Sequence, residues 1–208
     1  MNWLLNNWDQ VLEALGQHIV IALTSIGIAF VISLVVGIWA ARREAVFHAA
    51  IAVSGILYTI PTLAFLALLI PIVGLGKTNA IICMVAFSLM IMIRNVAVGI
   101  RNVPSEVVDA GRGMGMTAFD ILTRIELPLA APVILDGVRN AAVTIVATAT
   151  LGALVASGGL GRFIVDGLAR QEYERLVAGA LLVSLLAVAT EAAFGVVAQF
   201  STRKGVAV

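Results

Sequence analysis

The stretch VPSEVVDAGRGMGMTAFDILTRIELP, residues 103–128, decides the fold. It is a polar segment in a chain whose neighbouring runs are long and mostly uncharged. Its charged residues are Glu106, Asp109, Arg112, Asp120, Arg124 and Glu126. Because charged side chains are costly inside a lipid bilayer, this segment is expected to lie in water between two membrane spans.

Two short helices are expected within this polar segment. Ser105 is suited to cap the first, since serine side chains accept hydrogen bonds from the free N–H groups of a first helical turn. Gly113 or Gly115 would end that helix, because glycine tolerates the left-handed conformation common at helix ends. Thr117 would cap the second helix, with Asp120 at the third helical position in place of the usual Glu or Gln of a capping box.

The composition of the whole chain is that of an integral membrane protein. Of its 208 residues, 61% are hydrophobic and 12% are charged, and the mean hydropathy is +1.07. Soluble domains average about a quarter charged residues. The net charge of +1 argues neither for nor against nucleic acid, but the sequence has no basic cluster, so no nucleic-acid partner is expected. The single cysteine, Cys83, excludes an intramolecular disulfide and is expected to pack as a small apolar residue.

Five apolar runs are long enough to cross a hydrocarbon core of about 30 Å as helices. They lie near residues 19–41, 50–76, 78–100, 127–161 and 176–200. The second run contains Pro61 and Pro71, which should kink or interrupt a helix. The sequence therefore predicts an all-α, polytopic bundle of transmembrane helices over residues 18–202.

Residues 1–17 allow two interpretations. Leu4, Trp8, Val11 and Leu15 recur at the spacing of one helical face. This pattern favours an amphipathic helix lying in the membrane interface. The alternative is a simple extension of the first span, and the sequence leaves both open.

The orientation is predicted from the distribution of Lys and Arg, which are more frequent in cytoplasmic segments. With the N-terminus outside and the C-terminus in the cytoplasm, the inner segments carry Arg42, Arg43, Arg101, Arg112, Arg124, Arg203 and Lys204. The outer segments carry Lys77, Arg162, Arg170 and Arg175. Seven against four favours this orientation, which also places residues 103–128 in the cytoplasm.

The polar segment carries a pattern of fixed spacing. Its residues are Asp109, Ala110 and Gly111, then Gly115, and then Ile125, Leu127 and Pro128. This pattern resembles the EAA loop of bacterial ABC import permeases, written E-A-A-x3-G-x9-I-x-L-P. The resemblance implies a type I ABC permease fold, the MetI-like class, in which residues 105–115 form a cytoplasmic coupling helix. Asp109 stands where the family has Glu, and Gly111 stands where it has the second Ala.

The same resemblance implies the partners. These are separate ATPase subunits that bind ATP and Mg, a second permease subunit, identical or paralogous, and an extracytoplasmic substrate-binding protein. The chain would lie in the lipid of the bacterial cell (inner) membrane as a multi-pass subunit. It would itself be no enzyme and hold no cofactor.

Further segments resemble permease subunits of glycine betaine/carnitine/choline osmoprotectant importers. They read YTIPTLA (58–64), GLG (74–76), GMGMT (113–117), IELPLAAPVILDGVRNA (125–141) and SGGLG (157–161). The implied function is the import of such osmoprotectants. Two alternatives stay open: a permease for another small solute such as an amino acid, and a non-transporting membrane scaffold.

Four ionisable residues fall within or near the expected spans: Arg94, Asp136, Arg139 and Glu191. They are candidates to line or gate the transport path, since charges in membrane helices tend to face water or the bundle interior. The alternative is that they lie near the inner interface and extend into water. Asp136 and Arg139 are three residues apart, a spacing at which they could pair on one helix face.

Other motifs do not indicate an enzyme. Gly76-Lys77-Thr78 resembles the end of a phosphate-binding P-loop, but position 71, where that loop needs glycine, is proline. His18 and His48 stand thirty residues apart with no clustered cysteine or carboxylate, so the sequence predicts no metal site.

Overall fold

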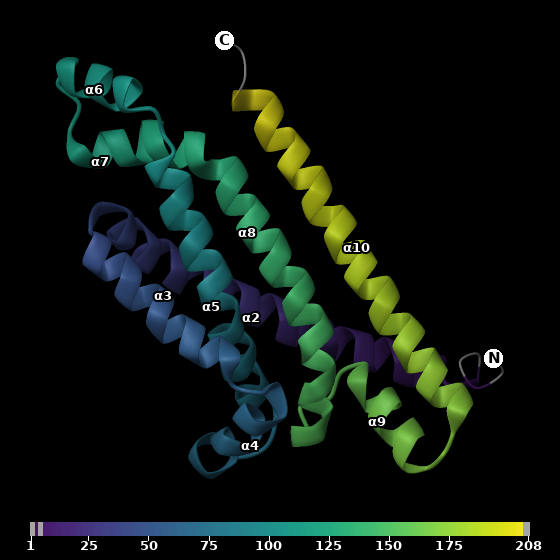
Figure 1. The fold of residues 1–208 in the computed structure, drawn as a ribbon. Helices are drawn as coiled ribbons and strands as arrows, with labels where there is room; N and C mark the ends of the chain where they lie inside the picture. The colour runs from purple at the N-terminus through teal and green to yellow at the C-terminus, as the bar shows by residue number, and fades with distance from the viewer. Residues whose placement is uncertain (1–2, 4–5, 206–208) are drawn as a thin grey trace.

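The computed structural model describes residue 3 and residues 6–205, and all regular structure in that part of the chain is helical. The helices are α2 (Trp8–Arg42), α3 (Glu44–Thr59), α4 (Thr62–Val73), α5 (Lys77–Arg101), α6 (Ser105–Gly113), α7 (Ala118–Ile121), η1 (Leu122–Glu126), α8 (Leu127–Thr148), η2 (Ala149–Val155), α9 (Gly161–Ala169) and α10 (Tyr173–Gly205). The segment η1 is a π-helix and η2 is a 3-10 helix. Figure 1 shows them as a bundle of long, inclined helices with short helices at both ends.

Within the described residues, four helical segments are long and apolar enough to cross a membrane: α2, α5, residues 118–155 and residues 173–196. The pair α3 and α4 would make a fifth span, but the two helices are bent by 97°. The break falls at Pro61, whose ring disfavours helical backbone at the preceding residue, and Ile60 is extended (ψ 128°). Pro71 lies inside α4 and does not end it. The predicted run 50–76 is therefore two helices, interrupted at the first proline.

Two further predicted boundaries differ from the structure. The helix α2 is continuous from Trp8, so residues 8–17 and the first predicted span form one helix. Its 35 residues reach about 52 Å, well beyond a hydrocarbon core of about 30 Å. The predicted run 127–161 is too long, because α8 ends at Thr148 and η2 ends at Val155. Ala156 then takes a left-handed conformation (φ 57°), which ends the helical path.

The helix α5 is the centre of the bundle, and α2, α3, α4 and α8 pack around it. Small residues set the closest crossings. A Cβ at Gly37 would lie 2.6 Å from Val96 Cβ, and a Cβ at Gly137 would lie 2.5 Å from Asn95 Cβ. Glycine is thus what lets α2 and α8 approach α5.

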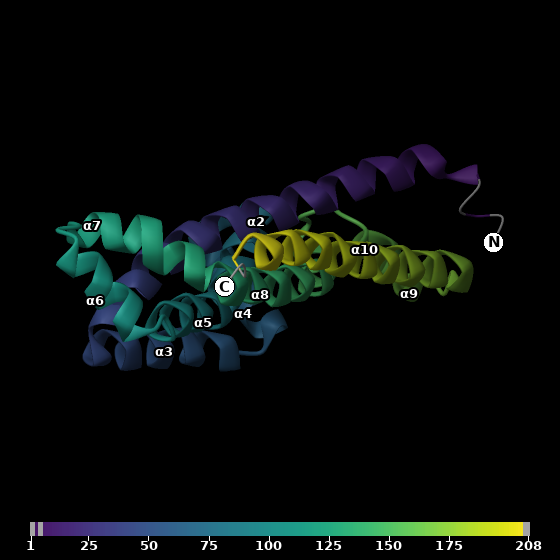
Figure 2. The same ribbon diagram turned by 90° about the horizontal axis from the view of Figure 1, so that it is seen from above.

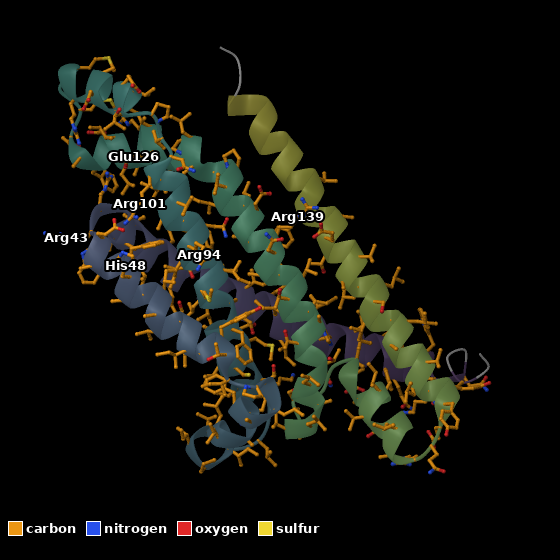
Figure 3. The ribbon with its side chains drawn as sticks, viewed as in Figure 1. Arg43, His48, Arg94, Arg101, Glu126 and Arg139 are labelled. Carbon is orange, nitrogen blue, oxygen red and sulfur yellow. The ribbon has the colours of Figure 1, made fainter. Side chains whose placement is uncertain are left out.

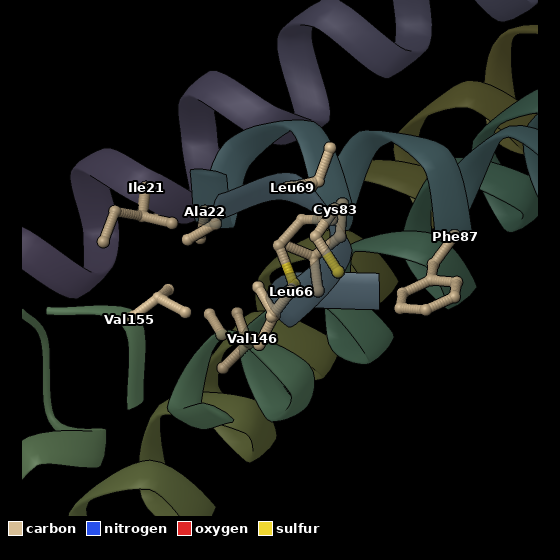
Figure 4. Packing of buried hydrophobic residues seen from close by; sticks show 12 residues of the cluster. Ile21, Ala22, Leu66, Leu69, Cys83, Phe87, Val146 and Val155 are labelled. Atoms are coloured by element: carbon tan, nitrogen blue, oxygen red, sulfur yellow. The ribbon is translucent and has the colours of Figure 1, made fainter. Parts of the chain in front are cut away.

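The largest apolar cluster joins five elements, α2, α4, α5, α8 and η2 (Figure 4). Its buried members include Ile21 of α2, Leu66 of α4, Cys83 of α5 and Val155 of η2. Cys83 is fully buried with a free thiol, which confirms the prediction that it packs as an apolar residue.

The two ends of the bundle carry different elements. The short helices α6 and α7 lie at the end of the bundle where α10 finishes, but well apart from α10 (Figures 1 and 2). The helices α4 and α9 lie at the opposite end, as does the start of α2. This arrangement places residues 103–128 and the first turns of the chain at opposite ends.

Candidate functional site

The segment from Pro104 to Glu126 is a helical hairpin made of α6, α7 and η1. Pro104, not Ser105, occupies the capping position of α6, and Ser105 is already the first helical residue, so the predicted serine cap is wrong. The helix ends at Gly113, and Gly115 supplies the left-handed turn (φ 79°). The Met116 N–H then donates to the Gly111 carbonyl at 3.1 Å and closes the turn. Both predicted glycines therefore take part in ending the helix.

The second arm of the hairpin begins with the predicted capping box. The Asp120 N–H donates to Thr117 Oγ1 at 3.1 Å, and the Thr117 N–H donates to the Asp120 carboxylate at 3.4 Å. The Thr117 hydroxyl also donates to that carboxylate, and this bond holds the pKa of Asp120 below its ordinary value. Arg124 lies 3.3 Å from Asp120, one turn further along. These local contacts fix the direction in which α7 starts.

Gly111 lies on the inner face of α6, where α6 packs against α7 and η1. It is the buried residue of α6. A Cβ at this position would lie 2.7 Å from Ile125 Cδ1, 3.4 Å from Met116 Sδ and 3.6 Å from Ile121 Cγ1. The spacing between the two halves of the EAA-like pattern thus has a structural cause: a small residue of α6 packs against the isoleucine of η1.

The outer face of the hairpin is exposed and partly apolar. Asp109 and Ala110 are exposed, and the Asp109 carboxylate forms an ion pair with the Arg112 guanidinium at 2.9 Å. Two large apolar side chains project here, Met114 (75% exposed) and Phe119 (73% exposed). Exposed apolar side chains rimmed by charge are typical of a protein-binding surface.

Leu127 and Pro128 lead from the hairpin into the membrane helix. Leu127 starts α8 directly after the π-helical turn, and Pro128 falls in the first turn, as predicted. Leu127 is half-buried and packs against the cluster formed by α5 and α8. The second arm of the hairpin and α8 are thus one continuous helical path.

Arg42 and Arg101 connect helices at the hairpin end of the bundle. Neither role was predicted from the sequence. Glu126 is buried (3% exposed), and both its oxygens accept from Arg42 at the end of α2, one of them at 2.8 Å. Arg101 donates to the Ala40 carbonyl at 2.7 Å and lies 3.3 Å from Glu44 (Figure 3). These contacts tie η1 and α5 to the corner between α2 and α3. They join residues 57 to 84 positions apart, so no local pattern could have revealed them.

The possible pair of Asp136 and Arg139 is not the ion pair that the structure forms. Arg139 pairs with Glu191 of α10, not with Asp136 (Figure 3). Asp136 and Arg94 are exposed on α8 and α5. The Arg139–Glu191 pair connects α8 to α10, which is otherwise the least buried of the spanning segments. Arg139 and Glu191 are 52 residues apart in sequence. Helical spacing relates only residues of one helix, so it could not suggest this pair.

At the end of the bundle opposite the hairpin, hydrogen bonds connect residues 157–161 to α2. His18 is buried; its Nδ1 accepts from the Leu160 N–H at 3.3 Å, and its Nε2 lies 3.0 Å from the Val146 carbonyl. Gln17 Oε1 accepts from the Gly159 N–H at 3.0 Å. His18 is thus a structural link between α2, α8 and the glycine-rich turn. In the described part of the chain, no three metal-binding side chains gather at one place.

Comparisons with known proteins agree with this geometry. The family model for the binding-protein-dependent transport system inner membrane component matches residues 33–202. The carnitine transport permease protein OpuCB of Listeria monocytogenes is 35% identical over 91% of this chain and 87% of its own length. The glycine betaine/carnitine/choline transport system permease protein OpuCB of Bacillus subtilis (strain 168) is 32% identical over 99% of this chain and 94% of its own length.

The fold is also that of a solved transporter subunit. A chain of the inward-facing MetNI methionine ABC transporter superposes with a TM-score of 0.81, at 20% identity, covering 94% of this chain and 98% of its own. The fold is accordingly the all-α type I ABC permease fold that the EAA-like pattern implied. The chain belongs to the family of binding-protein-dependent transport system inner membrane components, a family of multi-pass, non-enzymatic permease subunits.

Proposed function

We propose that this chain is the membrane-spanning permease subunit of an ATP-driven importer of glycine betaine/carnitine/choline-type osmoprotectants. The observation that carries the proposal is the hairpin of residues 104–126, whose inner face is locked by Gly111 and whose outer face exposes Met114 and Phe119. Such a surface suits the docking of a separate ATPase subunit, which would bind ATP and Mg. The osmoprotectant class is supported by what the relatives are named for.

The contacts around the hairpin suggest how docking would move the spans. Displacing α6 pulls on α7 and η1 through the Gly111–Ile125 contact, and η1 continues directly into α8. Glu126 carries the same motion to α2 through Arg42. In this mechanism the free energy comes from ATP in the partner, and the permease transmits it through these fastened helices.

The remaining partners and the orientation belong to the same proposal. A second permease subunit, identical or paralogous, would complete the path, and an extracytoplasmic binding protein would dock at the end that carries α4 and α9. The N-terminus then lies outside and the C-terminus in the cytoplasm. The excess of Lys and Arg on the hairpin side supports this orientation.

Cysteine labelling tests this arrangement. Because the native Cys83 is buried, cysteines introduced at exposed positions should react almost alone. We expect Leu168→Cys, on α9 and 70% exposed, to react with an impermeant thiol reagent in intact cells. Met114→Cys should react after the membrane is opened, and added ATPase should slow its reaction. Labelling of Met114→Cys in intact cells, or labelling unaffected by the ATPase, would contradict the proposed docking surface.

A further inference from the structure

A cavity of about 300 Å³ lies where α3 and α4 are broken, and α5 and α8 close it. Tyr58, Thr62, Phe87, Thr144 and Thr148 are among the residues that line it. This volume is at the lower end of the range for small-molecule sites. The described residues that line it are all uncharged. In sequence the lining runs from Tyr58 to Thr148, and the break in the second predicted run brings part of it to the cavity.

Aromatic rings form one wall of the cavity. The rings of Tyr58 and Phe87 are perpendicular, with centroids 6.3 Å apart and an interplanar angle of 87°. The Phe65 ring packs against the Phe87 ring, with 5.7 Å between their centroids. Phe87 lies at the margin of the apolar cluster (Figure 4), whereas Tyr58 is 47% exposed. The face of an aromatic ring attracts a cation through its quadrupole.

Three threonine hydroxyls in the lining already donate their protons to carbonyls of their own helices. The Thr144 hydroxyl donates to the Asn140 carbonyl at 2.8 Å, and the Thr148 hydroxyl donates to the Thr144 carbonyl. The Thr59 hydroxyl donates to the Ile56 carbonyl at 2.8 Å. These hydroxyls therefore offer lone pairs to a ligand. The helix α3 ends at the same break, so the negative end of its dipole lies beside the cavity.

The lining offers aromatic rings and oxygen lone pairs but no carboxylate. This combination favours a weakly hydrated cation. A primary ammonium or a metal ion needs strong hydrogen-bond acceptors or anionic ligands to replace its water. A quaternary ammonium group has no N–H to satisfy and is weakly hydrated, so ring faces and polarised oxygens suffice. We propose that this cavity is the permease's own binding site for the quaternary ammonium group of the solute, on the translocation path. This inference rests on the proposed function.

Tyr58 gives the sharpest test, because it is exposed and its removal leaves the apolar cluster intact. In proteoliposomes that contain the complete importer, loaded binding protein and ATP, we expect Tyr58→Leu to lower choline uptake about tenfold, the effect of losing one well-placed ring. Tyr58→Phe, which keeps the ring, should stay within about twofold of the wild type. Phe87→Leu should repeat the loss, and the amount of assembled complex serves as the check on its folding.

A binding measurement separates this site from the importer's overall substrate. Tetramethylammonium should bind the complex purified without its binding protein, and the neutral carbon isostere of choline, 3,3-dimethylbutan-1-ol, should bind at least tenfold more weakly. Tyr58→Leu should abolish that preference. Wild-type choline uptake in Tyr58→Leu, or equal binding of the cation and its isostere, would overturn the site while leaving the proposed function standing. A wild-type complex that imports no quaternary ammonium solute would overturn the proposed function instead.

Discussion

Replacing Gly111 with Trp is expected to abolish solute uptake, whereas Gly111→Ala should remain close to wild type. A Cβ at Gly111 meets the far end of a flexible side chain, Ile125 Cδ1, at 2.7 Å, and that end can rotate away. An indole also has to displace Met116 and Ile121, which lie within 3.6 Å of the Cβ position. Overpacking of this kind typically costs about 1–3 kcal/mol, which we expect to force α6 away from η1.

The measurements for this pair are uptake in membrane vesicles and recovery of the ATPase on the tagged permease. We expect Gly111→Trp to insert normally in the membrane but to lose both uptake and ATPase binding. Gly113→Ala is a matched control, because a Cβ at Gly113 meets nothing within 4 Å. Normal uptake and ATPase binding by Gly111→Trp would show that the inner face of the hairpin does not support coupling.

The second large effect is expected at Gly161, at the other end of the bundle. A Cβ here would lie 2.0 Å from the Thr150 carbonyl oxygen and 2.6 Å from Thr150 Cα. Both are backbone atoms of η2, so relief requires moving a whole helical segment rather than one side chain. We expect Gly161→Ala to destabilise the protein by about 3 kcal/mol or more, the upper end of the overpacking range.

Thermal unfolding of the purified permease in detergent, together with its yield from membranes, measures this effect. Gly16→Ala on α2 is the control, since it makes the same change where a Cβ meets nothing within 4 Å. In a helix interior that control should be neutral or slightly stabilising, because alanine favours the helix over glycine by about 1 kcal/mol. A Gly161→Ala protein with the yield and unfolding temperature of the wild type would contradict the tight packing of the 157–161 turn on η2.

Features with a local cause could be predicted from the sequence. The proline ring at Pro61 acts on its neighbour, so the break between α3 and α4 was foreseeable. Thr117 and Asp120 are three residues apart, and their capping box follows from that spacing alone. The EAA-like pattern likewise indicated the fold, through its resemblance to the loop of ABC import permeases.

Contacts between distant segments could not be predicted in the same way. The Arg42–Glu126 and Arg139–Glu191 pairs join residues 84 and 52 positions apart. The tertiary fold selects such partners, so helical spacing wrongly matched Arg139 with Asp136. Helical spacing likewise does not show that Gly111 packs inside the hairpin. The ring pair of Tyr58 and Phe87 also depends on the fold, since it needs the bend between α3 and α4 beside α5.

ATP-dependent uptake by the complete complex, reconstituted in proteoliposomes, tests the central claim most directly. The account predicts that glycine betaine, carnitine or choline on its binding protein stimulates ATP hydrolysis and accumulates inside, and that both stop without the ATPase. Methionine or another amino acid should do neither. Stimulation by an amino acid but by none of the three quaternary ammonium solutes, or uptake that persists without the ATPase, would contradict the account.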